Sequence, residues 1–133
     1  MENMEEKKES FVKKNILIVE DDDIIRKLLV IEFKRRGHTV LEYADAAAAM
    51  RDIEREKPTF DSAVVDLMNM GYGGNMGDYL KKFSEYKATL IIYYTALMQS
   101  QFNTKILDNP NTYYIHKVPG SIKTVIDKAI EGI

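Results

Sequence analysis

The sequence contains no cysteine and only two histidines, so several kinds of chemistry are excluded or disfavoured at the outset. Without cysteine the chain can form no disulfide, carry no catalytic thiol and bind no metal through sulfur. The two histidines, His38 and His116, disfavour a zinc site built from histidine alone. The chemistry of the chain must therefore be sought among its other polar residues.

Long apolar runs and an excess of one charge are also missing. No apolar stretch approaches the roughly 20 residues that a membrane span requires. The formal net charge of −2, from 19 basic and 21 acidic side chains, gives no electrostatic argument for nucleic acid or an anionic membrane. With 133 residues, 45% of them hydrophobic, the sequence suits one soluble domain, which we expect to be cytoplasmic.

The first 14 residues differ in composition from the rest. They carry four Glu and four Lys, with Phe11 and Val12 as their apolar pair, and they lack the apolar core of a signal peptide. We expect residues 1–14 to form a solvated tail, with Phe11 docking on a domain that spans residues 15–133.

Apolar strands alternate with amphipathic helices along that domain. The predicted strands are 16–19, 39–43, 62–66, 90–94 and 112–115. The predicted helices are about 25–36, 46–57, 76–83, 97–107 and 122–130, and Ile25, Leu28, Leu29 and Phe33 mark the inner face of the first. Five strands alternating with five helices predict an α/β fold, with a parallel sheet covered by helices on both faces.

Polar residues follow four of these strands at the point where each one ends. Asp66 ends the run Ala63-Val64-Val65, and Glu20 and Asp21 follow the first strand. Thr95 follows the fourth strand and Lys117 follows the fifth. Because the carboxyl ends of parallel strands meet at one edge of the sheet, where ligands bind in such folds, we expect these five side chains to converge.

The chemistry of this set points to a metal and an anion. Three neighbouring carboxylates repel one another unless a cation offsets their charge, and Mg²⁺ bound by carboxylate and carbonyl oxygens would do so. Lys117 and the Thr95 hydroxyl would then suit a phosphoryl group carried by Asp66.

The chain resembles the receiver domains of response regulators in two-component signalling, of the stand-alone type found in chemotaxis. The matching motifs are Ile-Leu-Ile-Val-Glu20-Asp21 followed by Arg26, Val-Val-Asp66-Leu-Met, Thr95-Ala96, and Tyr114-Ile-His-Lys117. The resemblance covers about residues 15–131. It implies a flavodoxin-like, doubly wound fold with strand order 2-1-3-4-5.

The resemblance also implies a role for each residue. Asp66 would accept a phosphoryl group from a phosphohistidine on a histidine kinase or a histidine phosphotransfer protein. Glu20, Asp21, Asp66 and the backbone carbonyl of Met68 would bind Mg²⁺. Lys117 would pair with the phosphoryl oxygens, and Thr95 and Tyr114 would form the conformational switch.

Output would pass to a protein target through the surface of the fourth helix, fifth strand and fifth helix. No effector domain follows residue 131 in this sequence, so we expect a stand-alone regulator that is not an enzyme beyond its own phosphotransfer and slow self-dephosphorylation.

The sequence departs from the family pattern in three features. The proline expected after the phosphoacceptor is absent, and Met70-Gly71-Tyr72-Gly73-Gly74 stands there instead. We expect this Gly-rich loop, 71–77, to be mobile. The family's Lys-Pro pair is Lys117-Val118-Pro119 here, so we predict a trans bond after Lys117. Met68 and Leu97, two residues beyond Asp66 and Thr95, are apolar and cannot orient an attacking water, which predicts slow self-dephosphorylation.

Other residues receive structural interpretations. We expect Asp22 and Asp23 to be surface or helix-capping residues and His116 to pack on the other side of its strand from Lys117. We expect Arg26 to lie on the exposed side of its helix, near the mouth of the site.

Three other functions are alternatives. The first is a receiver-like binding module that acts without phosphorylation. The second is a haloacid-dehalogenase-like phosphatase, which needs an acid where Met68 stands. The third is a flavodoxin-type FMN carrier, whose phosphate Glu20 and Asp21 would repel.

Overall fold

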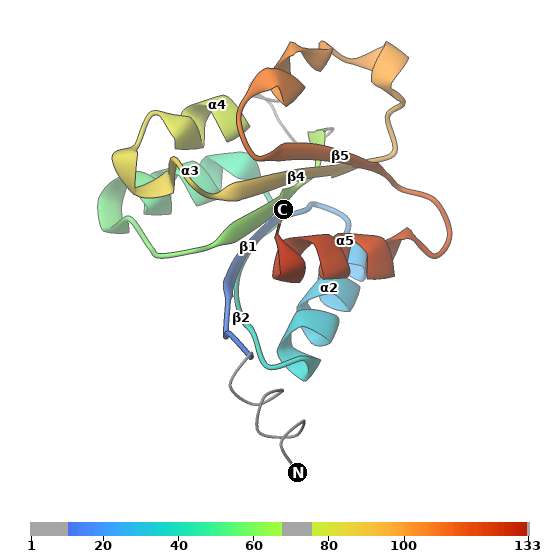
Figure 1. Ribbon diagram of the computed structural model, residues 1–133, viewed down its shortest axis with the longest axis horizontal. Helices are drawn as coiled ribbons and strands as arrows, with labels where there is room; N and C mark the ends of the chain where they lie inside the picture. Colours follow the sequence, from blue (N-terminus) through green and yellow to red (C-terminus); the bar gives the residue numbers. More distant parts are fainter. Residues whose placement is uncertain (1–10, 68–75, 133) are drawn as a thin grey trace.

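A computed structural model describes residues 11–67 and 76–132 of the chain. The centre of the fold is a five-stranded parallel sheet with the strand order β2-β1-β3-β4-β5 (Figure 1). The strands are β1 (Asn15–Val19), β2 (Thr39–Tyr43), β3 (Ser62–Val65), β4 (Leu90–Thr95) and β5 (Thr112–His116). This order confirms the predicted doubly wound, flavodoxin-like topology, and it places β3 at the centre of the sheet.

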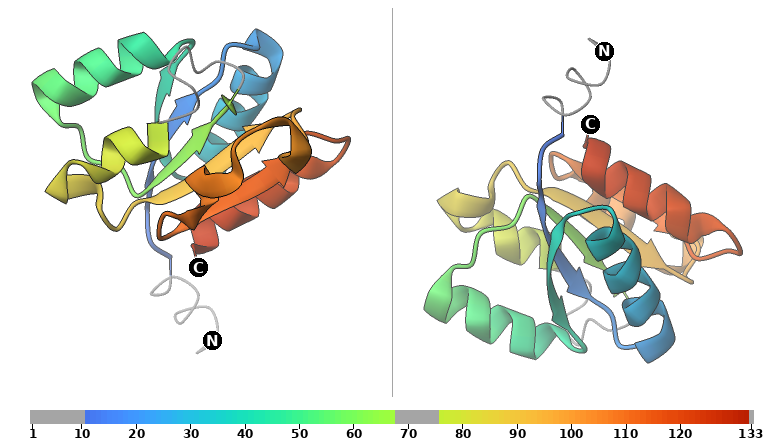
Figure 2. Two further views of the ribbon diagram at one scale, coloured as in Figure 1. Left: turned by 90° about the horizontal axis from the view of Figure 1, so that it is seen from above. Right: turned by 90° about the horizontal axis from the view of Figure 1, so that it is seen from below.

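Helices cover both faces of the sheet (Figures 1 and 2). In the described part of the chain they are α2 (Asp23–Arg35), α3 (Ala46–Glu56), α4 (Met76–Lys81) and α5 (Ser121–Glu131). Helices α2 and α5 pack on one face, and α3 and α4 lie on the other. The buried side of α2 consists of Leu29, Val30 and Phe33, whereas Leu28, predicted on that side, is 47% exposed.

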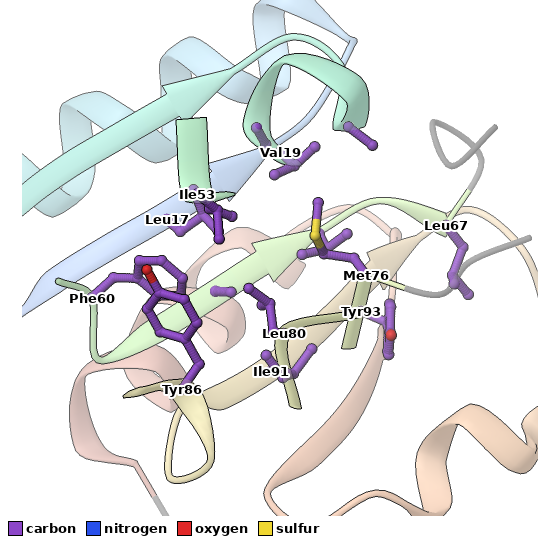
Figure 3. Close-up of a cluster of buried hydrophobic side chains, with 14 of the residues drawn as sticks. Leu17, Val19, Ile53, Phe60, Leu67, Met76, Leu80, Tyr86, Ile91 and Tyr93 are labelled. Carbon is purple, nitrogen blue, oxygen red and sulfur yellow. The ribbon is translucent and has the colours of Figure 1, made fainter. Parts of the chain in front are cut away.

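The hydrophobic core is divided by the sheet into two clusters. All four residues of β3 are buried, and their side chains alternate between the clusters. Figure 3 shows the cluster on the α3 and α4 side, where Phe60 stacks on Tyr86 with ring centroids 4.5 Å apart. A charged side chain within a strand that is buried on both faces would lose its hydration. The carboxylate of Asp66 accordingly follows β3 directly, at the carboxyl end of the strand.

The described part of the N-terminal segment contacts the amino end of the sheet. Phe11 stacks on His38 at 5.5 Å between ring centroids, as expected from the sequence, although its side chain remains 53% exposed. The Lys14 N–H donates a hydrogen bond of 3.0 Å to His38 Nδ1. Gly37 lies beside the Phe11 ring and has a φ of +93°. A Cβ at position 37 would come within 3.1 Å of that ring.

The segment 97–107, predicted as the fourth helix, folds differently. It forms two 3₁₀ segments, η3 (Gln99–Gln101) and η4 (Thr104–Asp108), separated by extended backbone at Phe102 and Asn103. Side chains compete for the backbone here, because Gln101 accepts the Met98 N–H and Asn103 accepts the Lys105 N–H. A third 3₁₀ segment, η2 (Ser84–Tyr86), follows α4.

The peptide bond after Lys117 and the Gly-rich loop were the other two features predicted from the sequence. The Lys117–Val118 peptide bond is trans, as predicted. Met68 and most of the Gly-rich loop lie outside the described residues, so the expectation of a mobile loop stays a prediction. Within residues 11–67 and 76–132, the structure has no helix of the length and apolarity that crossing a bilayer requires.

Candidate functional site

The backbone ladders continue past the ends of β1 and β3 and bring two carboxylates together. The Glu20 N–H donates to the Tyr43 carbonyl at 3.0 Å, and the Asp66 N–H donates to the Val19 carbonyl at 3.0 Å. Since Val19 is aligned with Val65 in the sheet, Glu20 and Asp66 follow at neighbouring positions. Both residues are nearly inaccessible, with 2% and 4% of their surface exposed.

Lys117 joins these two carboxylates from the end of β5. Its Nζ lies 2.8 Å from Glu20 Oε1 and 2.9 Å from Asp66 Oδ2, and only 13% of its side chain is exposed. The Lys117 N–H donates to the Thr95 carbonyl at 2.7 Å, which fixes the start of the side chain against β4. The sequence prediction that Asp66 and Lys117 converge is therefore confirmed by direct contact.

At Glu20 and at Lys117, burial and hydrogen bonding shift the side-chain pKa in opposite directions. Burial raises the pKa of Glu20 to about 7, although hydrogen bonds from Lys117 and from the Asp22 N–H oppose this. Burial of the ammonium would lower the pKa of Lys117, but its hydrogen bonds to Glu20 and Asp66 outweigh this and raise it. The lysine is thus held as a cation between the two acids.

Asp21 completes an acidic cluster that suits a hard divalent cation. Glu20, Asp21 and Asp66 each offer a carboxylate oxygen, and these oxygens lie within 4.8 Å of one another. Asp21 is exposed, so the cluster is open to solvent on one side. Oxygen ligands of this charge and spacing fit Mg²⁺, which keeps part of its water shell when proteins bind it. Met68, the fourth predicted ligand, lies outside the described residues.

Thr95 and Tyr114, the predicted switch pair, meet at the backbone of Leu97. Thr95 is fully buried, and its Oγ1 accepts the Leu97 N–H at 3.2 Å. The Tyr114 hydroxyl donates to the Leu97 carbonyl at 2.7 Å, and its ring packs against Phe102 with centroids 5.6 Å apart. The two hydroxyl groups therefore hold the same residue.

Four residues near the site were expected to have structural roles, and one of these predictions needs correction. Asp22 caps α2 by accepting the N–H groups of Ile24 and Ile25, and Asp23 is exposed, as predicted. His116 is half-buried and hydrogen-bonds the Ala96 carbonyl at 3.0 Å. Arg26 lies next to the site, as expected, since it contacts the Glu20 backbone, but it is not on the exposed side of its helix.

The Arg26 side chain is turned toward the sheet edge and is 14% exposed. Its Nη1 donates to the Glu20 carbonyl at 2.8 Å, and its Nε lies 3.3 Å from Glu42 of β2. The prediction from helical periodicity was wrong because a guanidinium with a long stem can reach over the end of its helix to a carbonyl that the apolar pattern does not reveal.

Two residues beside Lys117 were not identified from the sequence. Tyr94 is 3% exposed, and its hydroxyl lies 2.6 Å from Ser121 Oγ. The signal was available in principle, since a tyrosine in a fully buried strand needs a hydrogen-bond partner for its hydroxyl. The identity of that partner depends on how α5 packs beneath the sheet.

Comparison of the chain with known proteins gives matches in structure. No family model matches the sequence, and no curated protein matches it either. The chemotaxis response regulator CheY4 of Vibrio cholerae is 21% identical, with a TM-score of 0.71 over 89% of this chain and 99% of that one. The response regulator TrrA of Thermotoga maritima, solved with Mg²⁺ and BeF, is 22% identical, with a TM-score of 0.67 over 87% and 98%.

A third structure, the receiver domain of the Francisella response regulator 1452, is 23% identical and has a TM-score of 0.69 over 88% of this chain and 93% of that one. The chain therefore has the fold of the response regulator receiver domains. At these identities the likeness concerns the fold.

Proposed function

We propose that this chain is a response regulator receiver domain that accepts a phosphoryl group on Asp66 and changes its surface in response. The observation that carries the proposal is the position of Lys117, whose ammonium bridges Glu20 and Asp66 at 2.8 and 2.9 Å. A buried lysine between two carboxylates, with a third acid exposed beside them, combines an acceptor, a phosphoryl ligand and a cation site in one place.

The proposed reaction uses the Asp66 carboxylate as nucleophile. One carboxylate oxygen attacks the phosphorus of a phosphohistidine on the partner, an O–P bond forms, and the P–N bond to the imidazole breaks. The electron pair of that bond returns to the imidazole nitrogen. Lys117, whose ammonium has three N–H donors and contacts two carboxylates here, then pairs with the new phosphoryl oxygens.

Mg²⁺ is part of the proposal because the acidic cluster fits it. Glu20, Asp21 and Asp66 would hold the ion, with the carbonyl of Met68 as the expected fourth protein ligand. When bound, the ion supplies positive charge that offsets the carboxylates and the phosphoryl oxygens.

The contacts around Leu97 support Thr95 and Tyr114 as the switch. Thr95 Oγ1 accepts the Leu97 N–H, so the hydroxyl proton can be donated to a phosphoryl oxygen on Asp66. A shift of Thr95 toward that group would pull on Leu97, whose carbonyl binds the Tyr114 hydroxyl. The proposed output surface then consists of η3, η4, β5 and α5, in place of the predicted fourth helix.

The proposed phosphodonor is a histidine kinase or a histidine phosphotransfer protein. Support comes from the apolar surface beside the cluster, where Ile24 is 72% exposed, Leu28 47% and Val118 50%. Val118 and Lys117 also line a groove of about 510 Å³, together with Ile25 and Ile122. Apolar side chains exposed next to a reactive group are typical of a protein-docking site.

The alternative function is a binding module that recognises a protein without being phosphorylated. The same exposed apolar surface would serve it, and the departures at Val118 and in the 71–77 loop favour it. The alternative gives no reason for burying Lys117 between two acids, since paired buried charges contribute little net stability. We therefore place it second.

The experiment that tests the proposal is incubation with acetyl phosphate and Mg²⁺, followed by intact-mass measurement. We expect the wild type to gain the mass of one phosphoryl group, and neither the Asp66→Asn variant nor a sample treated with a metal chelator to do so. The Asp61→Asn variant is the matched control, because Asp61 is exposed at the opposite edge of the sheet, where it accepts the Asn15 N–H. A wild type without mass gain would favour the binding module.

A further inference from the structure

The loop that carries Lys117 into the site has little burial of its own. Val118, Pro119 and Gly120 are all exposed, and Gly120 adopts a φ of +84° at the start of α5. In the family that the sequence resembles, proline directly follows the lysine, whereas Val118 stands here. The contacts that restrict this loop are therefore of another kind.

Ser121 closes the loop on itself. Its hydroxyl donates to the Val118 carbonyl at 2.6 Å and accepts the Val118 N–H at 3.2 Å, and its own N–H donates to the same carbonyl at 3.0 Å. Ser121 itself is buried, with 6% of its surface exposed, so its side of these hydrogen bonds faces the interior. Both polar groups of the Val118 backbone are thereby bound to one side chain.

Tyr94 ties this closed loop to the sheet. The Ser121 hydroxyl has a single proton, which it gives to the Val118 carbonyl, so the Tyr94 O–H is the donor in the 2.6 Å contact with Ser121 Oγ. The Tyr94 ring also lies beneath the lysine, with Lys117 Nζ 5.6 Å from the ring centroid. One tyrosine thus contacts the ammonium and, through Ser121, the backbone that follows it.

We propose that Tyr94 and Ser121 are positioning residues for Lys117, which hold its ammonium over Asp66 through the buried hydroxyl pair and the aromatic ring. The inference rests on the proposed function for the role of Lys117, but the geometry it concerns is present before any phosphoryl group arrives. Lys117 is held at its start by Thr95, and the Tyr94–Ser121 pair restrains the chain after it.

The test compares Tyr94→Phe and Ser121→Ala with Ser121→Thr, which keeps the hydroxyl. Tyr113→Phe is the matched control, because Tyr113 lies on β5 with Lys128 Nζ 3.9 Å from its ring centroid, away from the loop. Affinities for Mg²⁺ alone and for beryllofluoride in saturating Mg²⁺ are measured by calorimetry. The ¹⁵N resonance of the Lys117 ammonium, assigned with a Lys117→Met variant, is followed separately.

We expect Tyr94→Phe and Ser121→Ala to weaken beryllofluoride binding about fivefold, the effect of one lost hydrogen bond. Mg²⁺ binding should be unchanged or tighter, because Lys117 competes with the ion for Glu20 and Asp66. Ser121→Thr and Tyr113→Phe should behave as the wild type. Equal weakening of both affinities would indicate a merely structural role, and unchanged beryllofluoride affinity would overturn the proposal.

The ammonium resonance separates this inference from the proposed function. If the wild type fails to bind beryllofluoride, the proposed function fails, and the resonance alone decides the positioning role. We expect a sharp Lys117 signal in the wild type and in Tyr113→Phe, and a shifted or broadened signal in Tyr94→Phe and Ser121→Ala. The same signal in all four proteins would overturn the positioning role.

Discussion

Thr95 and Tyr114 lie on adjacent strands, and their hydroxyl groups bind opposite sides of one residue. Thr95 Oγ1 accepts the N–H of Leu97 at 3.2 Å, and the Tyr114 hydroxyl donates to the Leu97 carbonyl at 2.7 Å. The first turn after β4 is therefore held from two strands at once, and a displacement of either side chain must be transmitted through Leu97.

This shared partner predicts energetic coupling between the two side chains. In a double-mutant cycle of Thr95→Val and Tyr114→Phe, the free energies of unfolding should deviate from additivity by about 0.5 kcal/mol or more. Urea denaturation measures the cycle. The control cycle combines Thr95→Val with Tyr113→Phe, and its two free-energy changes should be additive. Among the described residues the Tyr113 ring contacts Lys128, whereas the Leu97 carbonyl binds the Tyr114 hydroxyl. Additivity in both cycles would contradict the coupling.

Gly77 is predicted to be intolerant of any side chain. Its N–H donates to the Tyr93 hydroxyl at 2.8 Å, and a Cβ at this position would lie 2.5 Å from that oxygen. Because Tyr93 is fully buried in β4, Gly77→Ala should destabilise the fold by about 1–3 kcal/mol. Adding Tyr93→Phe removes the oxygen and should recover part of the loss. A Gly77→Ala variant as stable as the wild type would disprove the close contact.

His38 predicts a loss of stability in acid. Burial, with the nearby charges of Lys14 and Arg36, lowers the pKa of His38 below its usual 6.5. Between that lowered pKa and 6.5 the unfolded chain binds more protons than the folded one, so stability falls as the pH falls through this range.

The variant His38→Asn keeps an acceptor for the Lys14 N–H and does not titrate. Thermal unfolding between pH 7.5 and 5 should show a shallower loss of stability for His38→Asn than for the wild type. Parallel curves would show that His38 carries no such linkage.

Mg²⁺ is predicted to stabilise the folded chain. If Mg²⁺ binds the cluster in the folded chain and not the unfolded chain, it should raise the free energy of unfolding. The increase should be about 1.4 kcal/mol when Mg²⁺ is at ten times its dissociation constant. Sodium chloride of equal ionic strength is the control for screening. Asp21→Asn should fold normally, since Asp21 is exposed, but should lose most of the Mg²⁺ effect. Equal stabilisation of Asp21→Asn would place the ion elsewhere.

The phosphorylated form is predicted to be long-lived. Leu97 is half-buried against the core beside Thr95, and neither it nor Met68 offers a polar group to orient an attacking water. A Met68→Asn and Leu97→Glu double variant should therefore dephosphorylate roughly tenfold faster than the wild type. The decay of the intact-mass signal after removal of acetyl phosphate measures both rates, and similar half-lives would refute the prediction.

The regular parts of the fold were predictable because their signals are local. Apolar β-branched runs, helical spacing and strand-end polar residues depend on neighbours in the sequence, and they located Glu20, Asp66, Thr95 and Lys117 at one edge of the sheet. The segment 97–107 was mispredicted because its Gln and Asn side chains bind the backbone, and helical spacing does not register that competition.

The sequence by itself determined the class of fold, the order of its elements and the set of polar residues at the strand ends. Only the tertiary structure decided how those residues pair: that Lys117 bridges Glu20 and Asp66, that Arg26 turns toward the Glu20 carbonyl, and that Tyr94 reaches Ser121. The physical reason is that strand ends follow from local periodicity, whereas a long side chain selects its partner among groups that lie far apart in the chain and meet only when the layers pack.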